Sequence, residues 1–138
     1  MATYTLSTMA RYMRQLDICM MVTQSKRGIL NSRPMSNNGD VKYNGSSYFF
    51  TYEGSKKIKD IEANPQVNLN FEGKNDLYLS VSGKAKLLRN KALFAEHWVD
   101  SLQQWFKEGI ETKGMVLIHV EGEQLHYWQK NKEGKIKL

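Results

Sequence analysis

The pattern of hydrophobic and polar positions predicts short antiparallel strands along most of this chain. Residues 67–71 alternate as Val-Asn-Leu-Asn-Phe, and residues 77–87 alternate over a longer span with Gly83 in the middle. A period of two is typical of a strand that buries one face, and an interior glycine indicates a bulge or a bend. Further strands are expected over residues 18–23, 29–35 and 47–52, followed by a closing hairpin of residues 115–120 and 124–128 that turns at Glu121-Gly122.

Three helices are expected between these strands. Ser7 or Thr8 can cap the first, Ser55 begins the second, which stops near Asn64-Pro65, and Asn90 begins a third that ends around residues 104–106. Residues 36–40 are expected to form a polar loop. We therefore predict a mainly β protein with inserted helices, built as a six- to seven-stranded, closed or partly closed antiparallel barrel.

The length and composition favour one globular domain over residues 1–138. The chain is 41% hydrophobic and 25% charged, which is ordinary for a folded protein and argues against disorder. Four lysines fall in the last nine residues, so we expect residues 129–138 to form a basic C-terminal tail.

The net charge of +6 raises the question of a nucleic-acid partner. Outside the C-terminal residues, however, the basic side chains are scattered and often lie beside acids, as in the sequence Lys-Ile-Lys-Asp at 57–60. A solvated surface with one anion site explains the charge, and nucleic-acid binding remains the minor alternative.

Location is predicted from the hydrophobic runs and the cysteine content. The longest apolar run, residues 18–22, is far shorter than the ~20 residues that span a membrane. The first residues do not resemble a signal peptide, and the single cysteine, Cys19, lies inside that apolar run. We expect a cytoplasmic protein with no membrane contact and a buried, unreactive thiol.

The start of the second helix carries an unusual charge. Ser55, a residue type favoured at the N-cap, is followed by Lys56 and Lys57, whereas the positive end of a helix dipole usually attracts acids. An anion bound there would account for both lysines, and Arg33 on a nearby strand could donate to the same anion. We hypothesise a phosphate-bearing ligand held by Arg33, Ser55 and one or both lysines. The alternative is that the lysines are merely solvated.

Other site chemistries find little support in the sequence. The three histidines show no metal-ligand spacing, so no metal site is expected, and no nucleophile–histidine arrangement is present. Trp105 and Phe106, after the third helix, either belong to the core or cover a flat ligand ring.

Several short motifs, in their order and spacing, resemble the pyridoxamine 5'-phosphate oxidase-like flavoproteins. The motifs are Ser-Arg-Pro-Met at 32–35, Phe-Phe-Thr at 49–51, Ser-Lys-Lys at 55–57 and Asn-Pro at 64–65. The late segments resemble the general-stress-protein branch of that family: Trp105-Phe106 with Gly109, residues 115–120, and Tyr127-Trp128.

The resemblance implies a split β-barrel that forms a homodimer and binds FMN in two grooves at the interface, with FAD as a further option. By this resemblance the arginine, the serine, the threonine and the lysines hold the phosphate, and the other residues lie along the flavin or face it from the partner subunit. The cofactor-binding residues that it predicts are Arg33, Pro34, Met35, Ser36, Phe50, Thr51, Ser55, Lys56, Lys57, Asn70 and Trp105.

Two departures from the family pattern limit the function that the resemblance implies. True pyridoxamine phosphate oxidases carry glutamine-arginine where this chain has Leu77-Tyr78, and they end in Arg-Leu-Pro rather than Lys-Ile-Lys-Leu. We therefore expect an FMN-dependent oxidoreductase of unassigned substrate with no identifiable catalytic side chain, since the flavin supplies the hydride chemistry. The alternatives are a non-enzymatic, flavin-binding stress protein and, less favoured, a nucleic-acid-binding barrel.

Overall fold

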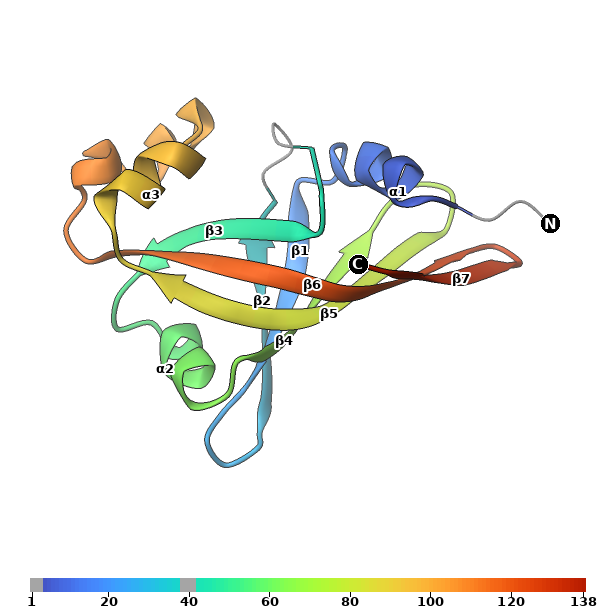
Figure 1. Cartoon of the computed structure of the whole chain (residues 1–138), viewed down its shortest axis with the longest axis horizontal. Coiled ribbons are helices and arrows are strands. Elements are labelled where there is room, and N and C mark those ends of the chain that lie inside the picture. The colour runs from blue at the N-terminus through green and yellow to red at the C-terminus, as the bar shows by residue number, and fades with distance from the viewer. Residues whose placement is uncertain (1–3, 38–41) are drawn as a thin grey trace.

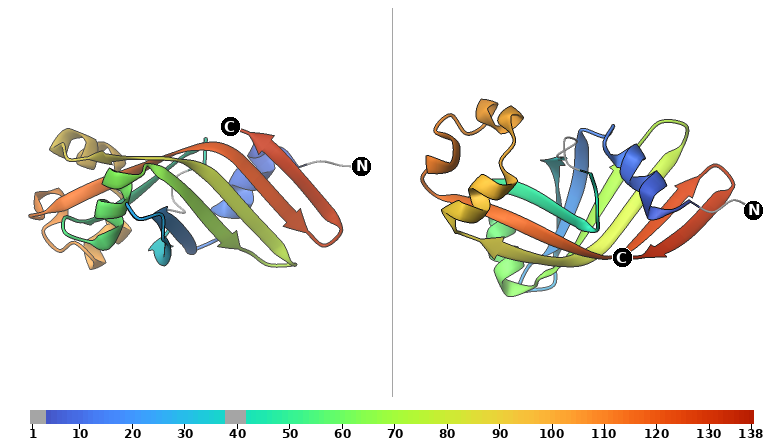
Figure 2. Two further views of the ribbon diagram at one scale, coloured as in Figure 1. Left: turned by 90° about the horizontal axis from the view of Figure 1, so that it is seen from below. Right: turned by 45° about the horizontal axis from the view of Figure 1, so that its top comes forward.

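The computed structural model describes residues 4–37 and 42–138, and it has a single antiparallel sheet (Figure 1). The sheet runs in the order β2-β1-β4-β5-β6-β3. β3 pairs with the first half of β6, and β7 pairs with its last residues. Its strands are β1 (Ile18–Gln24), β2 (Leu30–Ser36), β3 (Ser46–Tyr52), β4 (Gln66–Glu72), β5 (Leu77–Leu88), β6 (Met115–Gln129) and β7 (Lys132–Lys137). The strongly twisted sheet forms a split barrel, and the predicted mainly β fold is confirmed (Figure 2).

The helices lie at the ends of the sheet (Figures 1 and 2). They are α1 (Leu6–Met13), α2 (Lys56–Ala63), α3 (Lys91–His97) and two 3₁₀ turns, η1 (Asp100–Gln104) and η2 (Gly109–Glu111). Thr5, rather than Ser7 or Thr8, caps α1 by accepting from the Thr8 amide. Asn90 caps α3 as predicted, but that helix ends at His97 because Trp98 adopts an extended backbone. Of the expected polar loop, residues 38–40 lie outside the described residues.

The predicted hairpin at Glu121-Gly122 was wrong, because β6 continues through both residues. Gly122 is required for close packing rather than for a turn: its amide donates to the Gly45 carbonyl at 2.7 Å. A Cβ atom on Gly122 would lie 2.6 Å from a Leu138 methyl carbon and 2.7 Å from the Tyr43 hydroxyl. The glycine therefore lets the neighbouring chain segments approach the strand.

The predicted basic tail was also wrong, because residues 132–137 form β7. The strand pairs with β6 over Gln124–Gln129, and Ile136 lies opposite Leu125 and packs against the core. The lysines of β7 lie at outer positions that alternate with inward ones. In sequence this resembles a frayed basic tail, but the segment is an edge strand with charged outer positions.

Gly83 produces the predicted bend in β5. The pairing of β5 with β6 shifts register between Ser82 and Gly83, and Gly83 lies opposite Gly122. A Cβ atom on Gly83 would lie 2.1 Å from the Glu121 carbonyl oxygen, a distance that no side chain tolerates. The register shift marks a bulge, and a bulge bends the paired strands.

The buried side chains form two clusters. The larger fills the barrel and includes Met21, Leu69, Val81 and Ile118. The smaller lies between the segment of α3, η1 and η2 and the β3–β6 pair, and is built from Phe94, Phe106, Met115 and Leu117. The segment from α3 to η2 therefore has a core of its own.

Candidate functional site

A groove of about 700 Å³ lies between the ends of β2 and β3, the start of α2 and the segment after α3. This volume is typical of pockets that hold a cofactor-sized ligand. Seven of the eleven predicted cofactor-binding residues line it: Pro34, Met35, Ser36, Phe50, Thr51, Lys57 and Trp105.

The start of α2, beside the groove, has the features of an anion site, although the predicted residues Ser55 and Arg33 are not themselves among the lining residues. Ser55 is the N-cap residue of α2, but its side chain makes no capping hydrogen bond. Its Oγ atom is buried and lacks a hydrogen-bond partner among the described residues. A buried hydroxyl without a partner costs free energy, so this atom is suited to a ligand oxygen at the helix N-terminus.

Two cations lie near this end of the groove: Lys57 lines it, and Arg33 lies behind the lining residues. Burial lowers the pKa of Lys57, and the positive charge of Arg33 lowers it further. Burial also lowers the pKa of Arg33, although Asp60 partly offsets the effect. A bound anion would favour the charged form of Lys57, since an opposite charge raises the pKa of a cation.

Lys56 does not face the groove. Its Nζ atom lies 3.2 Å from Oδ1 of Asp60, one helical turn further along α2. Of the two predicted lysines, the structure therefore brings only Lys57 to the groove lining. Asn70 also lies apart: it is an exposed residue of β4, opposite Met20 of β1.

Aromatic side chains form one wall of the groove. Phe50 contacts Trp98 and Phe106 edge to face, with ring centroids 5.6 and 6.3 Å apart. Trp105 is 63% exposed, and its carbonyl oxygen accepts a hydrogen bond from the Tyr52 hydroxyl at 3.3 Å. An exposed indole beside a groove offers a flat apolar surface to a ring system.

The sequence reasoning missed most of the other groove residues, among them Arg14, Asp17 and Tyr52. Tyr52 was detectable, because Tyr48, Phe50 and Tyr52 follow the period of two and all line the groove. Arg14 and Asp17 gave no such signal, since the path of the chain between α1 and β1 brings them there.

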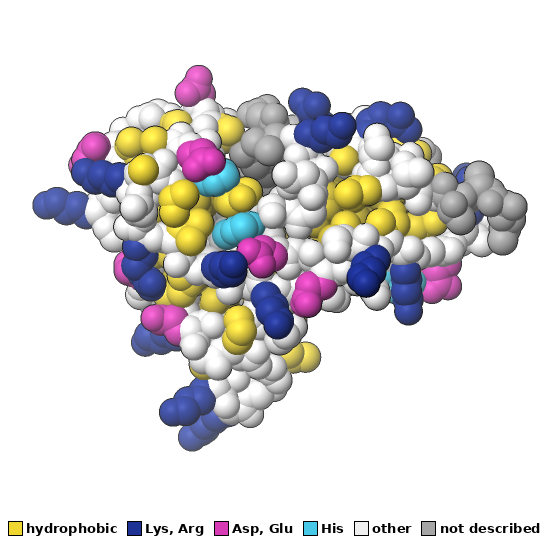
Figure 3. All heavy atoms as spheres, in the orientation of Figure 1, with side chains coloured by type: hydrophobic (Ala, Val, Ile, Leu, Met, Phe, Trp, Pro, Cys, Tyr) yellow, Lys and Arg dark blue, Asp and Glu magenta, His cyan; other side chains and the backbone are white. Residues whose placement is uncertain are grey.

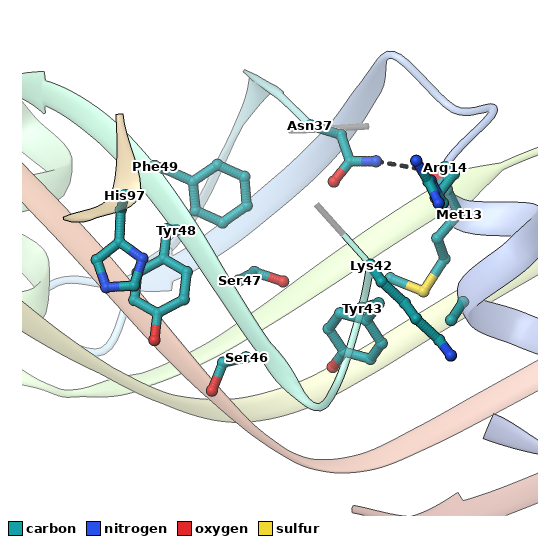
Figure 4. Close-up of a pocket in the computed structure, with 11 residues that line it drawn as sticks. Met13, Arg14, Asn37, Lys42, Tyr43, Ser46, Ser47, Tyr48, Phe49 and His97 are labelled. Carbon is teal, nitrogen blue, oxygen red and sulfur yellow. Dashed lines mark hydrogen bonds between the residues drawn. The ribbon is translucent and has the colours of Figure 1, made fainter. Parts of the chain in front are cut away.

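A second cavity, of about 40 Å³, adjoins the groove and shares Arg14, Asn37, Tyr48 and Phe49 with it (Figure 4). It has room for one or two waters and not for a ring system. Asn37 closes one side by donating to the Met13 carbonyl at 2.8 Å (Figure 4). His97 stacks on Tyr48 at the other side, with ring centroids 3.7 Å apart.

The described residues contain no group of three or more metal-ligating side chains. Cys19 is 1% exposed, so the expectation of a buried thiol is confirmed, and burial raises the pKa of that thiol to about 12. Among the described residues, no helix is long and apolar enough to cross a membrane.

The outer face of the sheet carries exposed apolar side chains next to the groove. Ile18 and Met20 of β1 are 53% and 39% exposed, and Tyr78 and Trp128 lie opposite each other across β5 and β6. Asn70 lies beside Met20 on this face. We call this set of residues, Ile18, Met20, Asn70, Tyr78 and Trp128, the outer face. Ile18 also lines the groove, so the two surfaces are continuous.

By its fold, the protein is a small antiparallel split barrel. The chain belongs to the pyridoxamine 5'-phosphate oxidase like family, whose model matches residues 5–138.

The chain is similar to general stress protein 26 in sequence and to a related protein in fold. It is 28% identical over 95 residues to general stress protein 26 of Bacillus subtilis (strain 168), an alignment that covers 66% of this chain and 67% of that protein. A crystal structure of a protein related to general stress protein 26 from Clostridium acetobutylicum has a TM-score of 0.83 at 18% identity, and the match covers 96% of this chain and 94% of that one.

A heme binding protein from Mycobacterium smegmatis shares the fold at a TM-score of 0.75 and 8% identity. The match covers 99% of this chain and 60% of that one. The predicted family resemblance is confirmed by the family model. At such low sequence identity, the similarity to these solved structures shows the fold alone.

Proposed function

We propose that this protein binds FMN in the groove and acts as an FMN-dependent oxidoreductase. The observation that carries the proposal is a groove of about 700 Å³ that is lined by Lys57 and aromatic side chains. Beside it lie the buried, unpartnered Ser55 hydroxyl, which precedes α2, and Arg33, which is close enough to lower the pKa of Lys57. Ser55, Lys57 and Arg33 would hold the phosphate, and Pro34, Met35 and Ser36 would lie along the flavin. The bound flavin would supply the hydride chemistry, and the chain would orient it.

The charge beside the groove favours a ligand that carries phosphate. Lys57 and Arg14 line the groove, and Arg33 lies close enough to Lys57 to lower its pKa. FMN and FAD both carry phosphate, and FAD remains the alternative cofactor.

The partner that we propose is a second copy of this chain, docked on the outer face. A monomer would leave Ile18, Met20 and Trp128 exposed beside the groove, and such apolar surface is typical of an interface. Two-fold docking would bring Asn70 of each chain towards the groove of the other, which accounts for its place outside the groove of its own chain. The single buried cysteine suits a reducing compartment, and we propose a cytoplasmic location.

Mixed surface charge supports a cofactor binder over a nucleic-acid binder. Lysines, arginines and acids are interspersed on the face that Figure 3 shows, rather than gathered by sign. A nucleic-acid-binding barrel would present a continuous basic stripe.

The test is to purify the protein, identify its chromophore and titrate the apo form with FMN and riboflavin, which lacks the phosphate. We expect a yellow protein that prefers FMN. Arg33→Ala should remove the preference, and Lys59→Ala, which changes an exposed lysine of α2, should not. An apo protein that binds neither flavin would refute the proposal. Turnover of a nicotinamide donor by the loaded protein would separate an oxidoreductase from the second candidate, a non-enzymatic flavin-binding stress protein.

A further inference from the structure

A buried carboxylate lies behind the proposed phosphate site. Asp60 of α2 is 2% exposed, and three side chains donate to it. The Thr23 hydroxyl donates to Oδ2 at 2.7 Å, the Asn31 amide to Oδ2 at 3.1 Å, and the Lys56 ammonium to Oδ1 at 3.2 Å. A buried charge persists when it is paired and hydrogen-bonded, as it is here.

Thr23 connects this carboxylate to Arg33. The threonine is 1% exposed on β1, and its Oγ1 accepts a hydrogen bond from Nη1 of Arg33 at 2.7 Å. The same Nη1 donates to the Met21 carbonyl at 3.2 Å, and Nη2 lies 3.7 Å from Oδ2 of Asp60. One edge of the guanidinium is thereby held against β1 and α2.

The direction of these hydrogen bonds follows from the donors available. Burial raises the pKa of Asp60, but the hydrogen bonds from Thr23, Lys56 and Asn31 and the charge of Lys56 outweigh burial and lower it. The ionised carboxylate can only accept, so the single proton of Thr23 goes to Asp60 and its lone pairs face Arg33. A hydroxyl polarised in this way is a stronger acceptor for a cation.

We propose that Thr23 and Asp60 are positioning residues of the phosphate site, which hold the guanidinium of Arg33 in place for the cofactor. The inference rests on the proposed function. A held guanidinium loses less conformational freedom on binding, so its bond to the phosphate gives more net affinity. The competing explanation is structural: the Thr23–Asp60 bond only ties α2 to β1, and its loss would weaken all ligands alike.

The experiment compares Thr23→Val, which keeps the shape and every charge, with Thr23→Ser, which restores the hydroxyl. Dissociation constants for FMN and riboflavin are measured by flavin fluorescence quenching on apo protein, together with thermal unfolding. We expect Thr23→Val to weaken FMN about tenfold, the size of one charged hydrogen bond, with riboflavin within twofold. Thr23→Ser should return the FMN value to within threefold of the wild type. Equal losses for both flavins, or an unchanged FMN constant, would overturn the inference.

A second variant keeps the test valid if Thr23→Val fails to fold. Arg33→Lys retains the charge but not the planar fork that reaches Thr23 and Met21, and its site is partly exposed. We expect it to show the same FMN-selective loss. In the double variant with Thr23→Val the losses should not multiply, because both changes break one bond. Multiplying losses would count against the inference.

The two proposals fail in different ways. If Arg33→Ala removes the preference for FMN while Thr23→Val leaves it intact, only the positioning role is refuted. If the wild type binds neither flavin, the function and the positioning role are refuted together.

Discussion

Replacing Lys57 and Lys56 separately tests which lysine holds the phosphate. The sequence pointed to both, whereas the structure brings Lys57 to the groove and pairs Lys56 with Asp60. We expect Lys57→Ala to remove one charge-assisted hydrogen bond to the phosphate, worth about 1.5–3 kcal/mol. The FMN dissociation constant should therefore rise roughly 10- to 150-fold.

Lys56→Ala should change the same constant by less than about threefold. Its side chain is 63% exposed and is paired with Asp60 rather than lining the groove, so its loss removes no proposed contact to the phosphate. Lys59→Ala, on the solvent side of the same helix, is the matched control for loss of a surface charge.

The assay is isothermal titration of apo protein with FMN and with riboflavin at two salt concentrations. Lys57→Ala should leave riboflavin binding nearly unchanged and reduce the salt dependence of FMN binding, because the lost interaction is between charges. Equal effects of Lys56→Ala and Lys57→Ala on FMN would refute the assignment of the groove end. Equal losses of FMN and riboflavin would refute the phosphate contact itself.

Four further results are expected. Trp105→Ala should weaken FMN and riboflavin alike, by roughly tenfold in titration, because the indole is proposed to cover the ring system that both share. Gly83→Ala should lower the free energy of unfolding in urea by about 3 kcal/mol, since its Cβ would meet the Glu121 carbonyl oxygen at 2.1 Å. The pKa of Asp60 is lowered in the folded state, so its carboxylate stabilises the fold above the unfolded carboxyl pKa of about 4, and this stabilisation is lost as pH falls through the folded value. Asp60→Asn should therefore flatten the pH dependence of the urea midpoint between pH 5 and 2. Met20→Glu should shift sedimentation towards the monomer and weaken FMN, and a monomeric wild type would contradict the proposed dimer.

Much of the fold could be predicted because its signals are local. Alternation marks β4 and β5, and Asn90 and Pro65 mark a helix start and a helix end. The hairpin predicted at Glu121-Gly122 was wrong, because sequence does not distinguish a glycine needed for close packing from a glycine needed for a turn.

The site was predictable only in part. Ser55 and Lys57 follow from the chemistry of a helix N-terminus, and Pro34 and Trp105 from the family resemblance. The pairing of Lys56 with Asp60 depends on which side of α2 faces β1. The Thr23–Asp60–Arg33 contacts join three elements through side chains and leave no spacing to detect. Such contacts are set by tertiary packing, which a local pattern does not encode.

The separate core beneath the segment from α3 to η2 has a consequence for binding. One side of the groove, with Pro34 and Thr51, rests on the barrel, and the other, with Trp105, rests on the small cluster of Phe94 and Phe106. A ligand that touches both sides would add contacts between that segment and the barrel, and by mass action it would stabilise the segment in this arrangement. Ligand affinity and the packing of the segment from α3 to η2 are thus linked.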